Sequence, residues 1–183
     1  MVTVRMPSGS GRRCDMLAAC MFLVCVILSM FCCDAGAETV TLGPLSIYID
    51  MSCVPDPYVV TRGEIEEMHE SFNCTVYSTT IGHANDVILE LHRLDREMNV
   101  SVERMIPFAE HLLPRGWSTE HGDFEVDGHE GVLINATDLY YPKMRLICFS
   151  PDGDDGWGCE IIVARSTVWG NRSIDLFRSI RVL

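Results

Sequence analysis

Residues 144–165 read MRLICFSPDGDDGWGCEIIVAR, and this stretch decides which class of fold the chain adopts. Two apolar runs, 144–150 and 158–165, flank the turn-forming run PDGDDGW. Pro, Asp and Gly favour tight turns, so the two runs are predicted to pair as an antiparallel hairpin. We expect the centre of this hairpin between Gly153 and Asp154.

A second hairpin signal lies just before the first. Residues 124–126 and 131–134 flank Asp127 and Gly128, and this dipeptide is a strong signal for a two-residue turn. The two hairpins follow one another along the chain. Together they predict an antiparallel meander built from four consecutive strands.

The chain ahead of the hairpins gives a mixed pattern. Alternation of apolar and polar residues predicts strands at 46–50 and 75–81. The run GEIEEMHE, residues 63–70, is acidic and has apolar residues at helical spacing, which predicts a solvated face or a short helix over the sheet. Residues 87–94, VILELHRL, fit both a strand and a helix, and periodicity leaves both readings open.

Two helices are predicted, one on each side of the meander. Apolar residues recur at helical spacing from Val102 to Leu113, and Ser101 is a suitable N-cap. Pro107 lies inside this pattern, so the helix either kinks or begins there. A closing helix is expected near 172–180, followed by a terminal strand at Val182. The order predicts the α+β class, with an antiparallel sheet of about six strands covered by helices.

The N-terminal segment has the features of an export signal. A basic stretch precedes the apolar run MLAACMFLVCVILSMFCC, residues 16–33, and small residues follow it. This order predicts a signal peptide over residues 1–37. The apolar run also approaches the length that crosses a bilayer, so an uncleaved anchor is the alternative, with membrane contact only through residues 16–33. We expect residues 38–183 to form a single exported domain, extracellular or in the cell envelope.

The charge of the chain excludes some partners. The formal net charge is −12 at pH 7, and Lys143 is the only lysine. A strongly acidic surface repels polyanions, so nucleic acid and anionic lipid are not expected as partners.

Four of the nine cysteines lie beyond the targeting segment, namely Cys53, Cys74, Cys148 and Cys159. An even number of cysteines in an exported domain predicts disulfides. The expected hairpin register places Cys148 opposite Cys159, where a close antiparallel pair allows a bond. That bond leaves Cys53 to pair with Cys74. The alternative is four reduced, buried cysteines.

Four N-glycosylation sequons follow the export signal, at Asn73, Asn99, Asn135 and Asn171. Their number favours a surface location in a cell that glycosylates asparagine. Cys74 lies inside the first sequon, so glycosylation and disulfide formation compete there. Asn171 has a second reading as the cap of the closing helix.

Several segments resemble a known group of proteins. The stretches LLPRGW, FEVDGHEGVLI, CFSPDG and STVWGNRSIDLFRSIRV resemble uncharacterised exported proteins of archaea. Those proteins are similar in turn to the PsbP-like fold of the photosystem II extrinsic protein. The resemblance covers roughly residues 40–183 and implies an α/β/α sandwich in which residues 87–94 form a strand. It implies no catalytic residue.

Candidate ligands for a metal such as zinc are His111, His121 and His129, together with Asp123 and Glu125. Imidazole and carboxylate groups are common zinc ligands, but the spacing of these residues matches no compact motif. Solvated histidines in turns and at sheet edges are the alternative.

Two classes of function follow. The first is a non-enzymatic secreted or envelope domain that contacts a protein partner, because no catalytic motif and no cofactor motif is present. The second is a metal-dependent binding protein or enzyme whose site is assembled from distant residues. Three or more clustered histidines and carboxylates in a pocket would favour the second class. Dispersed histidines beside an exposed apolar patch would favour the first.

Overall fold

The computed structural model describes residues 37–52, 54, 59–68, 73–82, 86–138, 143–153, 155–167 and 172–183. These residues belong to one compact unit, Gly36–Leu183. The predicted targeting segment up to residue 36, Cys53 and Asn171 lie outside the described residues. Within the described ranges, no helix is both long enough and apolar enough to cross a membrane.

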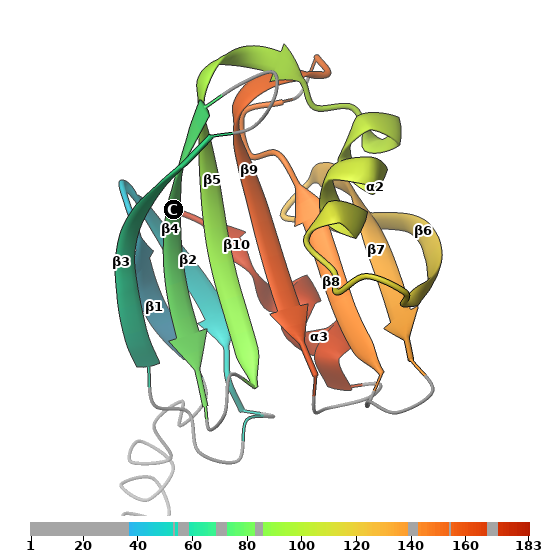
Figure 1. Ribbon diagram of the computed structural model, residues 1–183. Coiled ribbons are helices and arrows are strands. Elements are labelled where there is room, and N and C mark those ends of the chain that lie inside the picture. Colours follow the sequence, from blue (N-terminus) through green and yellow to red (C-terminus); the bar gives the residue numbers. More distant parts are fainter. Residues whose placement is uncertain are drawn as a thin grey trace, which may run out of the picture. The chain divides into compact units, whose positions relative to one another are not determined.

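The main element of the fold is a seven-stranded antiparallel sheet with the order β3-β4-β5-β9-β8-β7-β6 (Figure 1). Its strands are β3 (Val59–Met68), β4 (Asn73–Ile81), β5 (Val87–Asn99), β6 (Ser118–Val126), β7 (His129–Thr137), β8 (Met144–Phe149) and β9 (Trp157–Ser166). Neighbouring strands β6 to β9 pair consecutively, so the predicted meander is confirmed.

A smaller antiparallel sheet and two helices complete the described part of the chain. The sheet has the order β1-β2-β10 and consists of β1 (Ala37–Leu42), β2 (Leu45–Asp50) and β10 (Arg181–Val182). The helices are α2 (Val102–His111) and α3 (Arg172–Ser179). The closing helix and the terminal strand are therefore confirmed, whereas β1 was not expected.

The two faces of the large sheet bury two separate cores. On one face, the small sheet and α3 cover a core that includes Leu42, Ile49, Leu89, Phe149 and Phe177, all fully buried. This cover comes mainly from strands. The predicted α/β/α sandwich, with about six strands covered by helices, is therefore wrong.

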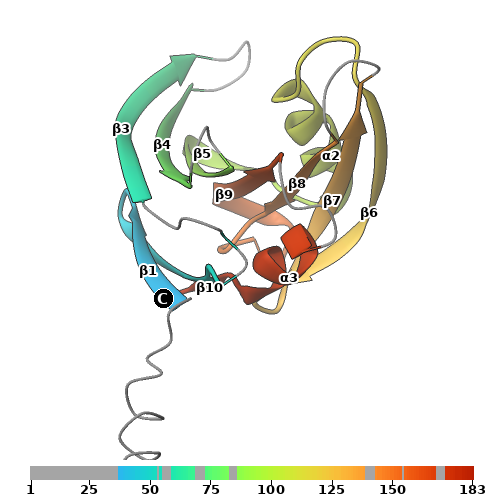
Figure 2. The ribbon, with the colours of Figure 1, turned by 90° about the horizontal axis from the view of Figure 1, so that it is seen from below.

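The opposite face is covered by a helix over part of its width only. Met105 and Ala109 of α2 pack against Ile134, Leu146 and Cys148 in the β7–β8 region. Figure 2 shows α2 beside β6, β7 and β8, with β3 and β4 at the other end of the curved sheet. The helix therefore leaves the β3–β4 part of this face without helical cover.

The acidic run 63–70 was predicted as a solvated face or a short helix; its described part is exposed, but the short helix is wrong. Residues up to Met68 belong to β3, an edge strand that pairs only with β4. The strand has a register shift between Thr61 and Gly63, and its residues from Arg62 to Glu67 are exposed. A charged and irregular edge strand resists pairing with other chains, which explains why alternation of apolar residues is missing here.

Other local signals are confirmed by the backbone. Residues 87–94 lie in β5, so the strand reading holds. Asp127 and Gly128 have φ of 55° and 87°, as a two-residue turn with positive φ at both positions requires. Helix α2 begins at Val102 and contains Pro107 in its interior, so the proline does not begin the helix.

The hairpin of residues 144–165 forms, but with a different register. Cys148 faces Val163 in the β8–β9 pair, not Cys159. The carboxylate of Asp152 accepts hydrogen bonds from the backbone N–H of Cys159 and of Glu160, at 2.8 and 3.2 Å. These bonds close a wide loop in place of the tight turn. Cys148 and Cys159 carry free thiols, and the predicted bond between them is wrong.

Candidate metal-binding site

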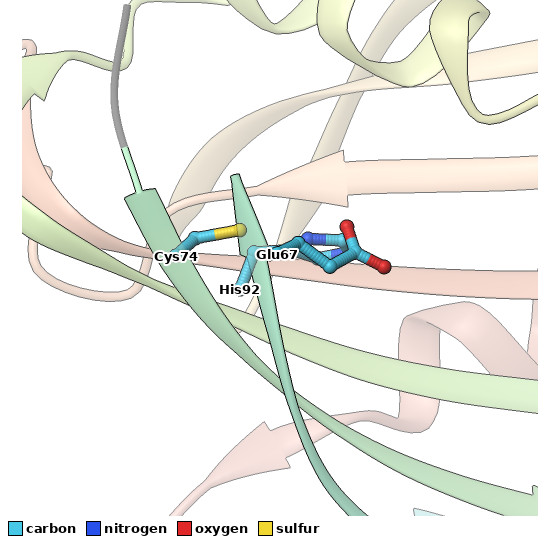
Figure 3. A group of neighbouring side chains, drawn as sticks. All are labelled: Glu67, Cys74 and His92. Carbon is cyan, nitrogen blue, oxygen red and sulfur yellow. The ribbon is translucent and has the colours of Figure 1, made fainter. Parts of the chain in front are cut away.

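Three adjacent strands bring Glu67, Cys74 and His92 together on the face of the large sheet that also packs against α2. Glu67 of β3 lies directly opposite Cys74 of β4. His92 of β5 faces Val76, which lies two residues along β4 from Cys74 on the same face. The carboxylate oxygen, the sulfur and a ring nitrogen all lie within 4.8 Å of one another (Figure 3).

The imidazole of His92 is enclosed and has no hydrogen bond. Its side chain is 2% exposed, and its ring meets the Phe108 ring edge to face with centroids 5.1 Å apart. Among the described residues, neither Nδ1 nor Nε2 has a hydrogen-bond partner. A buried polar group without a partner is rare and destabilising by about 1–3 kcal/mol. The His92 nitrogens are therefore available to bind a ligand.

Cys74 supplies a thiol that is buried and unbonded. The residue is 4% exposed and forms no disulfide with another described cysteine; Cys53, its predicted partner, lies outside the described residues. Burial, with the nearby charges of Glu67 and Asp95, raises the pKa of Cys74 to about 11. Nucleophilic cysteines have a lowered pKa, so this thiol is not activated for catalysis beside His92. A bound cation would lower the pKa of the Cys74 thiol, because a thiol that coordinates a metal loses its proton.

Glu67 forms the accessible side of the group. Its side chain is exposed, and together with Cys74 it borders a cleft of about 550 Å³. Asn73, Arg93 and Asp95 also line this cleft. The cleft gives solvent and ions a path to the sulfur.

A charged pair lies behind His92. The Oε2 atom of Glu90 is 3.6 Å from His92 Nε2, which is longer than a hydrogen bond. Its Oε1 atom accepts a hydrogen bond from Arg165 Nη2 on β9. Burial raises the pKa of Glu90, but His92 and Arg165 outweigh this effect and hold the pKa below its ordinary value. The carboxylate therefore stays ionised next to the imidazole.

The donor set fits a tetrahedral transition-metal ion. Zinc binds sulfur at about 2.3 Å and nitrogen or oxygen at about 2.0–2.2 Å, which holds neighbouring donors roughly 3.5 Å apart. Starting from atoms within 4.8 Å of one another, side-chain movements of about 1 Å close the shell. Thiolate and imidazole ligands favour zinc and similar ions over magnesium or calcium. The protein supplies three ligands, which would leave the fourth position of a tetrahedral ion open.

The residues predicted from sequence as metal ligands do not form this group. His111 ends α2, and His129 begins β7 with its ring stacked on Phe149 at a centroid distance of 6.3 Å. His121, Asp123 and Glu125 are exposed along the edge strand β6. Among the described residues, only Glu67, Cys74 and His92 bring three potential ligand atoms within 4.8 Å of one another.

The described sequons differ in accessibility. Asn73 and Asn99 are exposed, although the Oδ1 atom of Asn99 accepts the Ser101 N–H at 3.0 Å. Asn135 is half-buried, and its Oδ1 atom accepts a hydrogen bond from Arg145 Nε at 2.9 Å. Asn135 is therefore a poor acceptor for a glycan, and Asn73 is the sequon closest to the cleft.

Sequence reasoning missed this group because no local spacing reveals it. The three residues come from three strands, and their approach depends on the β3–β4 and β4–β5 registers. The one available signal was the alternation in residues 87–94, which assigns His92 to the opposite face from Leu89 and Leu91.

Comparisons with known proteins add no assignment. No protein-family model, no curated protein and no solved structure matches this chain.

Proposed function

We propose that this chain is an exported, non-enzymatic binding domain that holds a divalent transition-metal ion of the zinc type through Glu67, Cys74 and His92. One observation carries the proposal. The imidazole of His92 is 2% exposed, neither of its nitrogens has a hydrogen-bond partner among the described residues, and a thiol and a carboxylate lie within reach. A metal ion would satisfy the buried nitrogen and the thiol together.

The proposal favours the second of the two function classes, in its binding form. A group of imidazole, thiol and carboxylate is present beside a cleft, whereas the histidines expected from sequence are dispersed. Binding is proposed over catalysis because the pKa of the free thiol is raised to about 11. The signal peptide predicted over residues 1–37 would direct the domain outside the cytoplasmic membrane, where it would capture or carry the ion. A protein partner stays a prediction.

Cobalt titration of the full-length reduced chain tests the proposal. Cobalt replaces zinc in such sites, and a thiolate ligand gives an intense charge-transfer band in the near ultraviolet. We expect Cys74→Ala to lose one bound cobalt per chain relative to the parent chain, together with its share of this band. Cys159→Ala is the matched control, because Cys159 is also a free thiol but lies outside the group.

Measuring the difference between variants removes any contribution from the cysteines of the N-terminal segment. Equal cobalt binding by Cys74→Ala and by the parent chain would overturn the proposal. Loss of binding in the Cys159→Ala control would overturn it as well, because the ion would then be held elsewhere.

A further inference from the structure

The ion pair of Glu90 and Arg165 lies beside His92, and the two oxygens of the Glu90 carboxylate contact different partners. Glu90 precedes His92 by two residues on β5, so both side chains lie on the same face of the sheet. One carboxylate oxygen, Oε1, receives the Arg165 guanidinium. The other, Oε2, is directed toward His92 at 3.6 Å.

Arg165 reaches Glu90 diagonally across two strands. In the β5–β9 pair, Arg165 faces Ile88, and Glu90 faces Val163, two residues further along each strand. Glu90 is 13% exposed and Arg165 is 22% exposed, so the contact is largely shielded from water. Shielding strengthens the pair and restricts the carboxylate to one position. Glu90 is therefore held in place independently of His92.

Histidines that ligate a metal usually donate their second ring N–H to a carboxylate, which fixes the tautomer and raises the basicity of the ligating nitrogen. We infer that Glu90, held by Arg165, is the positioning residue for His92: it keeps Nε2–H directed at Oε2 and leaves Nδ1 as the metal ligand. This inference rests on the proposed metal-binding function. It assigns a role to two residues that do not touch the ion.

The separation of 3.6 Å between His92 Nε2 and Glu90 Oε2 fits this role in the metal-free state. Withdrawal of electron density by a metal makes the remaining N–H a stronger donor, and the contact shortens to a hydrogen bond as the ring settles. The same small movement accompanies closure of the shell around the ion.

Zinc titrations of Glu90→Gln and Glu90→Ala test the inference. Gln keeps the shape of the side chain but loses its charge. We expect zinc affinity to fall about tenfold in Glu90→Gln and up to about a hundredfold in Glu90→Ala, with one zinc still bound at saturation. Glu110→Gln is the matched control, because Glu110 is a partly buried carboxylate that accepts a hydrogen bond from Thr119 at 2.6 Å, outside the metal group.

A second measurement needs no substitution. Nitrogen-15 NMR of the histidine side chains identifies which ring nitrogen carries the proton, and we expect His92 to be protonated at Nε2 with and without zinc. Zinc bound through Nε2, or equal zinc affinity of Glu90→Gln and the parent chain, would overturn the inference alone. Failure of the parent chain to bind zinc would overturn the proposed function, and the inference with it.

Discussion

Replacing His92 by leucine is expected to leave the stability of the metal-free protein nearly unchanged while abolishing its response to zinc. The ring is 2% exposed and has no hydrogen bond at Nδ1 or Nε2. Removing a buried polar group without a partner gains about 1–3 kcal/mol. The variant loses the edge-to-face contact with Phe108, which contributes about 0.5–1.5 kcal/mol. The variant also loses the contact with the Glu90 carboxylate, whose pKa His92 helps to lower. These opposing contributions leave the metal-free variant within about 1 kcal/mol of the parent chain, or about 2–4 °C in Tm.

Zinc should separate the parent chain from the variant. At a free concentration about one hundred times Kd, a bound ion stabilises the parent chain by about 2.7 kcal/mol. This corresponds to a rise in Tm of about 5–11 °C for a domain of this size. The variant should not respond, because its leucine offers no ligand atom. The parent chain therefore melts close to the variant in chelator and above it in zinc.

Thermal unfolding followed by circular dichroism, first in chelator and then in excess zinc, measures both effects. His121→Leu is the control, because His121 is exposed on β6 and its replacement should change stability by no more than about 0.5 kcal/mol. The reasoning is refuted if His92→Leu melts well below the parent chain in chelator. It is also refuted if zinc raises the Tm of both proteins equally.

Three further outcomes follow from the structure. Alkylation of denatured but unreduced protein should label Cys148 and Cys159, and mass spectrometry that shows them linked would contradict the observed register. Gly43→Ala should lower the free energy of unfolding by about 1–3 kcal/mol in urea titrations, because φ is +59° and a Cβ would overlap the Tyr77 ring. Glu90 contributes stability above its ordinary pKa of 4.5 and loses it as pH falls through its lower folded pKa, so Glu90→Gln should flatten the acid limb of the stability profile. An unchanged acid limb would count against the ion pair.

The parts of the fold that follow from sequence are those set by local chemistry. Asp127 and Gly128 define their turn through positive φ, and the spacing of apolar residues defines α2. The β3 strand could not be found in this way. It is an edge strand with exposed glutamates, so its apolar and polar residues do not alternate.

The hairpin register and the site depend on contacts that sequence spacing does not encode. Asp152 binds two backbone N–H groups from the far side of its loop, and this capture moves Cys148 opposite Val163. Likewise, Glu67 reaches Cys74 only because β3 pairs with β4 in one register. A one-residue slip of either strand would turn one side chain to the other face.

Anomalous diffraction at the zinc absorption edge, from crystals of the zinc-loaded protein, tests the central claim most directly. The account predicts one anomalous peak between Glu67, Cys74 and His92, at about 2.3 Å from sulfur and about 2.0–2.1 Å from Nδ1. Occupied zinc elsewhere with this position empty, or no ordered zinc at all, would contradict it.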